Sequence, residues 1–125
     1  MSDPDKLIVL AKARLLLKDV NLAVESIRKA HLGDLKKQLI KSALSIPSNI
    51  AEGRRRASQR EFLQFLSVAL GSTGELETQL HGADDCRAIA SETCADLLTR
   101  TGEIGKMISS LRRRIIEDLG EDPDV

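Results

Sequence analysis

The sequence predicts an all-α fold, an antiparallel up-down-up-down four-helix bundle, and three observations predict it. Apolar residues recur at alternating spacings of three and four in four separate segments, which is the period of a helix face packed against neighbours. The chain holds two Phe and no Tyr or Trp, a composition that fits helices better than a sheet sandwich. Its 125 residues make one domain, and short links between the segments favour antiparallel neighbours.

The first helix is expected over about 5–29. Pro4 precedes it, at a position where a missing N–H group costs nothing. Its apolar seam consists of Val9, Ala13, Leu16, Val20, Ala23, Ile27 and Ala30.

The second helix is expected over about 34–53, with Gly33 or Asp34 as its cap. Pro47 removes one backbone hydrogen bond inside this segment, but the apolar pattern continues beyond it, so we expect a kink rather than an end. Gly53 is the expected C-cap. The seam consists of Leu35, Leu39, Ala43, Ile46 and Ile50.

The third helix is expected over 59–83 and the fourth over 92–119. Ser58 followed by Glu61 is typical of a capping box, and Ser91 is expected to cap the last helix, which Gly120 ends. The third seam consists of Phe62, Leu66, Ala69, Thr73, Leu76, Leu80 and Ala83. The fourth consists of Cys94, Leu97, Thr101, Ile104, Ile108, Leu111 and Ile115.

Charge is unevenly distributed along a chain whose net charge is zero. Residues 28–60 hold nine Lys or Arg and two acids, whereas residues 61–125 hold six basic and thirteen acidic residues. Such asymmetry suits an anionic partner, or the docking of identical subunits through opposite charges.

Three groups of basic residues are candidates for binding nucleic-acid phosphates, because guanidinium groups match phosphate oxygens and a helix N-terminus adds N–H donors. The first is the turn before the third helix, the second lies on the second helix, and the third lies near the end of the fourth. They are Arg54, Arg55, Arg56 and Arg60; Lys36, Lys37 and Lys41; and Arg112, Arg113 and Arg114. The alternatives are a solvated charged face or contacts between subunits. With so few aromatic residues, binding is expected to be to backbone rather than to bases.

Residues 45–80 contain a distinctive pattern. It consists of the run Ser45-Ile46-Pro47-Ser48-Asn49-Ile50-Ala51-Glu52-Gly53, and of Gly71-Ser72, Glu75-Leu76-Glu77 and Gln79-Leu80 further along. With this pattern the chain resembles the "four helix bundle protein" family. The motif residues to which we assign a structural role are Pro47, Ser48, Asn49, Glu52, Gly53, Glu61, Gly71, Ser72, Glu75 and Gln79.

That family includes proteins encoded in intervening sequences of large-subunit ribosomal RNA genes. It also includes the accessory variability determinant (Avd) proteins of diversity-generating retroelements. The resemblance implies a cytoplasmic, non-enzymatic homopentamer. For the retroelement branch it implies binding to a reverse transcriptase and to RNA or DNA; for the ribosomal branch it implies a scaffold with no settled activity. The opening helix lacks the aromatic residues of the ribosomal branch, so both branches stay open.

Two further features have a structural and a binding interpretation. Ser45, Ser48, Asn49 and Glu52 cluster around Pro47, where side chains can satisfy freed backbone groups, and Glu75 could join them; this network is favoured over a ligand site. Small residues recur along one face of the third helix, which fits packing inside the bundle or against another subunit. They are Ser67, Gly71, Gly74 and Thr78.

The sequence gives no support to an enzyme, a metal site or a cofactor. Glu77 and His81 lack the spacing of a di-iron bundle, and no phosphate-binding loop or catalytic triad occurs. Cys86 and Cys94 are expected to be free thiols in a cytoplasmic chain. No apolar run approaches the roughly 20 residues that span a membrane, so no membrane partner is expected.

Overall fold

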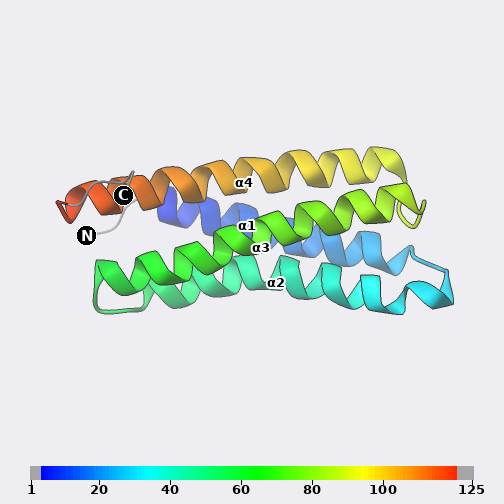
Figure 1. Ribbon diagram of the computed structural model, residues 1–125, viewed down its shortest axis with the longest axis horizontal. Coiled ribbons are helices and arrows are strands. Elements are labelled where there is room, and N and C mark those ends of the chain that lie inside the picture. Colours follow the sequence, from blue (N-terminus) through cyan, green and yellow to red (C-terminus); the bar gives the residue numbers. More distant parts are fainter. Residues whose placement is uncertain (1–3, 121–125) are drawn as a thin grey trace.

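The computed structural model describes residues 4–120 and consists of four long antiparallel helices (Figure 1). They are α1 (Pro4–Glu25), α2 (Gly33–Arg54), α3 (Gln59–Asp85) and α4 (Ser91–Asp118), with a short 3₁₀ turn, η1 (Ala30–Leu32), before α2. No strand occurs within residues 4–120. The predicted fold class is therefore confirmed.

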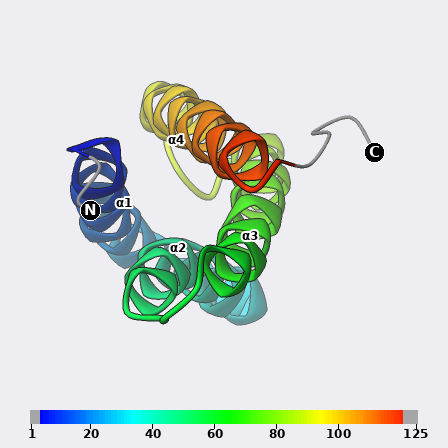
Figure 2. The ribbon, with the colours of Figure 1, turned by 90° about the vertical axis from the view of Figure 1, so that its left-hand side faces the viewer.

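Each helix packs on the helices beside it in a closed cycle, so that α1 contacts α2 and α4 but not α3 in the described part of the chain. Figure 2 shows this arrangement end-on, with α1 and α3 at diagonal corners. The α2–α3 contact is the most extensive and the α1–α4 contact the least. The α1–α4 side is thus the weakest edge of the bundle.

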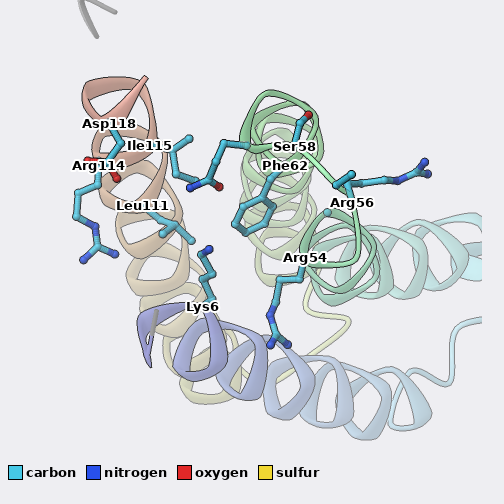
Figure 3. Close-up of a pocket in the computed structure, with 12 residues that line it drawn as sticks. Lys6, Arg54, Arg56, Ser58, Phe62, Leu111, Arg114, Ile115 and Asp118 are labelled. Carbon is cyan, nitrogen blue, oxygen red and sulfur yellow. The ribbon is translucent and has the colours of Figure 1, made fainter. Parts of the chain in front are cut away.

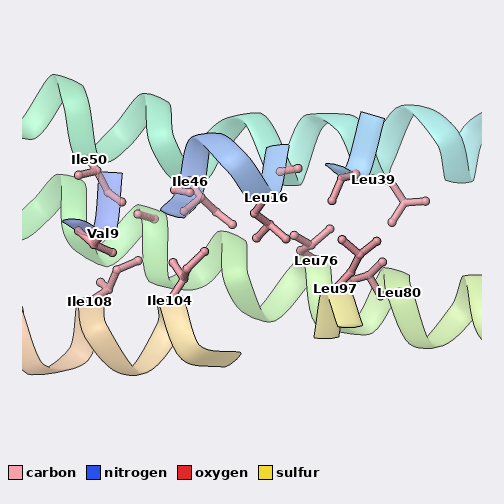
Figure 4. Close-up of a cluster of buried hydrophobic side chains, with 14 of the residues drawn as sticks. Val9, Leu16, Leu39, Ile46, Ile50, Leu76, Leu80, Leu97, Ile104 and Ile108 are labelled. Atoms are coloured by element: carbon pink, nitrogen blue, oxygen red, sulfur yellow. The ribbon is translucent and has the colours of Figure 1, made fainter. Parts of the chain in front are cut away.

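The core contains aliphatic residues from all four helices (Figure 4). The four predicted seams are buried almost throughout, apart from Leu35, which is half-buried, and Ala30, which is exposed in η1. The buried hydroxyls of Thr73 and Thr101 donate to carbonyls of their own helices, at 2.6 and 2.7 Å, so neither leaves a polar group unsatisfied. A helical period therefore predicted the core well.

The first helix ends at Glu25, earlier than the expected residue 29. The hydroxyl of Ser26 donates to the Ala23 carbonyl at 2.5 Å, and the Ile27 N–H bonds the Val24 carbonyl at 3.0 Å in a tighter, 3₁₀-like turn. This turn satisfies carbonyls at the helix end and still buries Ile27.

The second helix lies within one residue of its expected bounds, but both of its expected caps were wrong. It begins at Gly33 with Leu32 as its N-cap and no side-chain cap, because η1 leads directly into it. It runs unbroken through Pro47 to Arg54, with Arg55 as C-cap. Gly53 is therefore a helical residue, and its role is packing: a Cβ there would lie 2.6 Å from Cδ1 of Phe62 and 2.8 Å from Cβ of Phe65.

Ser58 caps α3 as expected, because its hydroxyl accepts a hydrogen bond from the Glu61 N–H at 3.1 Å. Ser91 does not cap α4, whose N-cap is Ala90. Instead the Ser91 hydroxyl donates to Asp84 Oδ1 at 2.6 Å and ties the start of α4 to the end of α3. Gly120 follows α4 with φ +75°, the left-handed conformation that glycine adopts easily.

Ion pairs bridge α1 and α4 along their length. Lys12 pairs with Glu103, Arg100 with Asp19 and Arg114 with Asp5, each with an N–O distance of 2.8 Å. The Lys12 ammonium donates to Glu103 and lowers the pKa of that carboxyl from its ordinary value of 4.5. All six side chains keep contact with solvent, so each pair contributes little alone.

The glycines of α2 and α3 are expected to respond in opposite directions to alanine. Gly53→Ala should lower the free energy of unfolding by about 1–3 kcal/mol, because the Phe65 Cβ cannot move without its backbone. Gly71→Ala should raise it by about 0.5–1 kcal/mol, because a Cβ there meets open space and alanine favours helix. Urea unfolding measures both; a Gly53→Ala variant as stable as the parent contradicts the close packing.

The α1–α4 ion pairs predict a pH dependence. The lowered pKa of Glu103 means that its contribution is present above pH 4.5 and is lost as pH falls through the folded value. Glu103→Gln should therefore lower the Tm at pH 7 and have little effect near pH 3. Lys12→Gln should behave alike, and the double variant should add nothing further. An equal effect of Glu103→Gln at pH 3 and pH 7 would argue against the pair.

Candidate nucleic-acid interface

The turn between α2 and α3 carries the densest basic cluster. Arg54 is the last residue of α2, residues 55–58 form the turn, and Arg60 lies in the first turn of α3. All four predicted arginines, Arg54, Arg55, Arg56 and Arg60, are exposed. Arg54 and Arg55 make no ion pair with any residue in 4–120, so their charges face solvent.

This turn borders a cavity of about 570 Å³ at the end of the bundle, which we call the terminal cavity (Figure 3). All four helices supply residues to it. Its base is apolar and its rim carries basic groups from three helices. The apolar residues include Phe62, Leu111 and Ile115, and the basic ones are Lys6, Arg54, Arg56 and Arg114.

The two phenylalanines hold two of the cations in place. The ammonium of Lys6 lies 5.0 Å from the centre of the Phe62 ring, and the guanidinium of Arg56 lies 4.8 Å from that of Phe65. Arg56 also pairs with Glu52 at 2.8 Å. In Figure 3 Arg56 points away from the terminal cavity, whereas the Lys6 ammonium points toward Phe62 and the Arg54 guanidinium points toward α1. Cation–π attraction of this kind orients a charge without neutralising it.

The predicted cluster on α4 does not form one surface. Arg112 donates from Nε to the Ser67 hydroxyl on α3 at 3.1 Å, and Arg114 donates to Asp5 on α1 at 2.8 Å. Arg113, between them, is exposed. Consecutive residues of a helix point about 100° apart, so Arg112 and Arg114 reach different neighbours and the three arginines do not share one face.

The predicted cluster on α2 lies far from the turn. Lys36 is half-buried, and Lys37 and Lys41 are exposed. Lys36 precedes Arg54 by eighteen residues of one helix, which is about 27 Å at 1.5 Å per residue. The lysines of α2 and the arginines of the turn are thus separate surfaces.

Lys6 was not predicted from the sequence. In an up-down-up-down bundle, the start of α1, the end of α2, the start of α3 and the end of α4 meet at one end (Figure 1). That rule, applied to the predicted helices, would have placed Lys6 beside Arg54. We call Lys6, Arg54, Arg55, Arg56 and Arg60 the basic end.

The polar motif residues lie between α2 and α3. The hydroxyls of Ser45 and Ser72 are 2.7 Å apart, and the Asn49 amide donates to the Ser45 carbonyl and hydroxyl at 2.8 and 3.0 Å. The amide does not bond the carbonyl of residue 43 that Pro47 leaves free. Glu52 pairs with Arg56, so it is not part of this network.

Three other motif residues lie apart from that network. Glu75 and Ser48 are exposed. The Gln79 Oε1 atom is buried without a hydrogen-bond partner in the described structure.

The small residues of α3 face outward. Ser67, Gly71, Gly74 and Thr78 are all exposed, and no atom lies within 4 Å of a Cβ built at either glycine. Packing within the bundle therefore does not account for these glycines.

Cys86 and Cys94 are free thiols. Burial, followed by the charges of Asp84 and Cys86, raises the pKa of the Cys94 thiol, which disfavours the reactive thiolate. Within residues 4–120 no His, Cys, Asp and Glu side chains gather as a metal site. None of the helices in that range is both long enough and apolar enough to cross a bilayer.

Comparison with known proteins gives one family and one fold. A family model described as "23S rRNA-intervening sequence protein" matches residues 5–110. A crystal structure from Bacteroides thetaiotaomicron VPI-5482, described as a protein with unknown function from the S23 ribosomal protein family, is similar with a TM-score of 0.80. It is 24% identical, over 87% of this chain and 98% of that one. No curated protein matches the chain.

Proposed function

The chain belongs to the 23S rRNA-intervening sequence protein family, and from this membership and its basic end we propose that it is a non-enzymatic accessory protein that binds nucleic-acid backbone. The observation that carries the proposal is the exposed arginine turn at the rim of the terminal cavity. Arg54 and Arg55 present unpaired guanidinium groups, which match phosphate oxygens in planar, two-point geometry.

The surroundings of the turn add to its electrostatic attraction. Lys6 contributes a further charge from α1, and the first N–H groups of α3 lie at the same turn. The Phe62 and Phe65 rings lie under cations, and Phe62 is only 3% exposed, so neither ring is open for a base to stack on. Binding is therefore salt-dependent and weakly selective for sequence.

The finer role implied by the resemblance, an adaptor for a reverse transcriptase in a diversity-generating retroelement, has no counterpart in the comparisons. It stays a prediction of the sequence.

Replacing Arg54 and Arg55 with Gln tests the proposal. The double variant should weaken binding to a labelled RNA or DNA strand about tenfold or more at ~0.1 M salt, and should reduce the slope of log K against log salt by about 0.7 per lost phosphate contact. Fluorescence anisotropy over a salt series measures both quantities.

The matched control removes the same charge elsewhere. Lys18 on α1 and Lys106 on α4 are exposed and lie outside the basic end, so Lys18→Gln/Lys106→Gln should retain the parent's affinity to within a few-fold. If both double variants lost the same affinity, the loss would reflect the net charge of the protein and not the basic end. If the arginine variant bound as tightly as the parent, the basic end would be excluded as the nucleic-acid-binding site.

A second candidate function is a protein scaffold built by self-association, and a specific observation favours it. α1 exposes Ile8, Leu15 and Leu22, seven residues apart on one face, with exposed fractions of 45%, 56% and 54%. α3 exposes Gly71 and Gly74, where a neighbouring side chain could approach the backbone. We call the three exposed α1 side chains the ridge, and the backbone left uncovered at the two α3 glycines the groove.

α1 and α3 do not contact each other within one copy. The two faces can therefore meet only between copies, with the α1 of one copy docked on the α3 of the next. Such head-to-tail contact closes into a ring or propagates as a chain. The homopentamer implied by the resemblance is a ring of this kind.

Complementary variants test the scaffold. Leu15→Gln/Leu22→Gln removes the ridge, and Gly71→Leu/Gly74→Leu fills the groove; light scattering should show each variant alone as a monomer. Mixed in equal amounts, they should form dimers that grow no further, because each retains one intact face. Failure of the mixture to pair, or a monomeric parent, would defeat the α1–α3 contact.

A further inference from the structure

We infer that the terminal cavity binds a nucleoside monophosphate, either free or as the phosphorylated end of a nucleic-acid strand. The second form rests on the proposed function, because the basic end would hold the rest of the strand. The first form does not. The inference follows from the cavity's size, its unequal walls and the placement of Lys6.

The size of the cavity suits one nucleotide and excludes a duplex. Its volume of about 570 Å³ lies within the roughly 300–1,000 Å³ of small-molecule sites. That volume equals a cube about 8 Å on a side, too small for a duplex, which is wider than its own major groove of roughly 12 Å. The base of the cavity is closed by Phe62, Leu111 and Ile115, which are at most 3% exposed. A strand can therefore enter by an end but cannot pass through.

One side of the cavity is prepared for a phosphate group. Lys6 comes from α1 and Arg54 from α2, and both line the cavity; in Figure 3 the Lys6 ammonium points toward Phe62 and the Arg54 guanidinium points toward α1. Neither is ion-paired to a residue in 4–120, so both charges are available. A terminal phosphate carries close to two negative charges, whereas a phosphate within a strand carries one. Two unpaired cations thus favour the terminal group.

The remaining walls suit a base. Gln59 at the start of α3 and Asp118 at the end of α4 also line the cavity, and their oxygens accept hydrogen bonds from amino groups. Inorganic phosphate has no amino group and would leave these two acceptors unused.

Lys6 links phosphate binding to the Phe62 ring. Its ammonium lies 5.0 Å from the centre of that ring. A phosphate that pairs with Lys6 draws the ammonium off the ring and so changes the surroundings of the buried Phe62 side chain. The Phe62 ring therefore reports a phosphate bound at Lys6, while Gln59 and Asp118 add contacts that only a base can use.

Nuclear magnetic resonance of the full chain tests this directly, because its aromatic side chains are two Phe and two His. Titration with adenosine monophosphate should shift the Phe62 ring signals. Phe65 lies under Arg56, outside the cavity lining, and should not shift. Adenosine alone and inorganic phosphate alone should each bind at least tenfold more weakly than the nucleotide.

Two variants probe the same site against a matched control. Lys6→Gln and Arg54→Gln should each weaken nucleotide binding at least fivefold. Lys18→Gln removes the same charge from α1 twelve residues further on, about 18 Å away, and should leave it unchanged. Circular dichroism confirms that each variant folds.

Strands with different ends separate the inference from the proposed function. One oligonucleotide is compared with a 5′-phosphate, with a 3′-phosphate and with hydroxyl groups at both ends; a phosphorylated end should strengthen binding at least fivefold. Equal binding of all three, with Phe62 unshifted by the nucleotide, overturns the inference and leaves the proposed function standing. Nucleotide binding without binding of any strand supports the inference for the free nucleotide and defeats the proposed function. Binding of phosphate alone as tightly as the nucleotide overturns the inference.

Discussion

The contact between α2 and α3 at Gly53 governs the structure of the basic end. A Cβ at that position would lie 2.6 Å from the Phe62 ring, so only glycine lets the two helices approach as they do. This approach allows α2 and α3 to be joined by a turn of four residues and buries Phe62 as the base of the terminal cavity. Arg54 at the end of α2 and Arg55 and Arg56 in the turn are all exposed.

The opposite edge of the bundle is held by a different kind of force. α1 and α4 share the least extensive helix contact, and exposed ion pairs bridge them at three levels. Exposed pairs are weak, so α1 depends mainly on its apolar contact with α2 and the core. The edge between α1 and α4 is therefore less completely covered than the others, and Leu15 and Leu22 lie along it with more than half of their surface exposed. Exposed apolar side chains therefore lie along the helix pair with the least extensive contact.

The few aromatic residues of this chain contribute to its electrostatics as well as to its packing. Phe62 and Phe65 each lie beneath a cation, one inside the terminal cavity and one outside it. Both phenylalanines lie near the start of α3, three residues apart. The beginning of this helix therefore positions both Lys6 and Arg56. This arrangement keeps several like charges close together at one end, which a purely aliphatic end would not stabilise.

The sequence by itself determined the helices and their buried faces, because a period of three and four residues records which side of each helix meets the core. It also determined Ser58 as a cap and the exposed arginines of the turn, which are local properties. It did not determine the end of α1 or the caps of α2, because Ser26, η1 and Gly53 act through contacts with the following turn or with another helix. Only the tertiary structure decided which basic residues share a surface: it separated the lysines of α2, engaged Arg112 and Arg114 with neighbouring helices, and brought Lys6 from α1 to Arg54. Charges far apart in the chain become neighbours through helix packing, and a local sequence pattern does not specify which helices pack together.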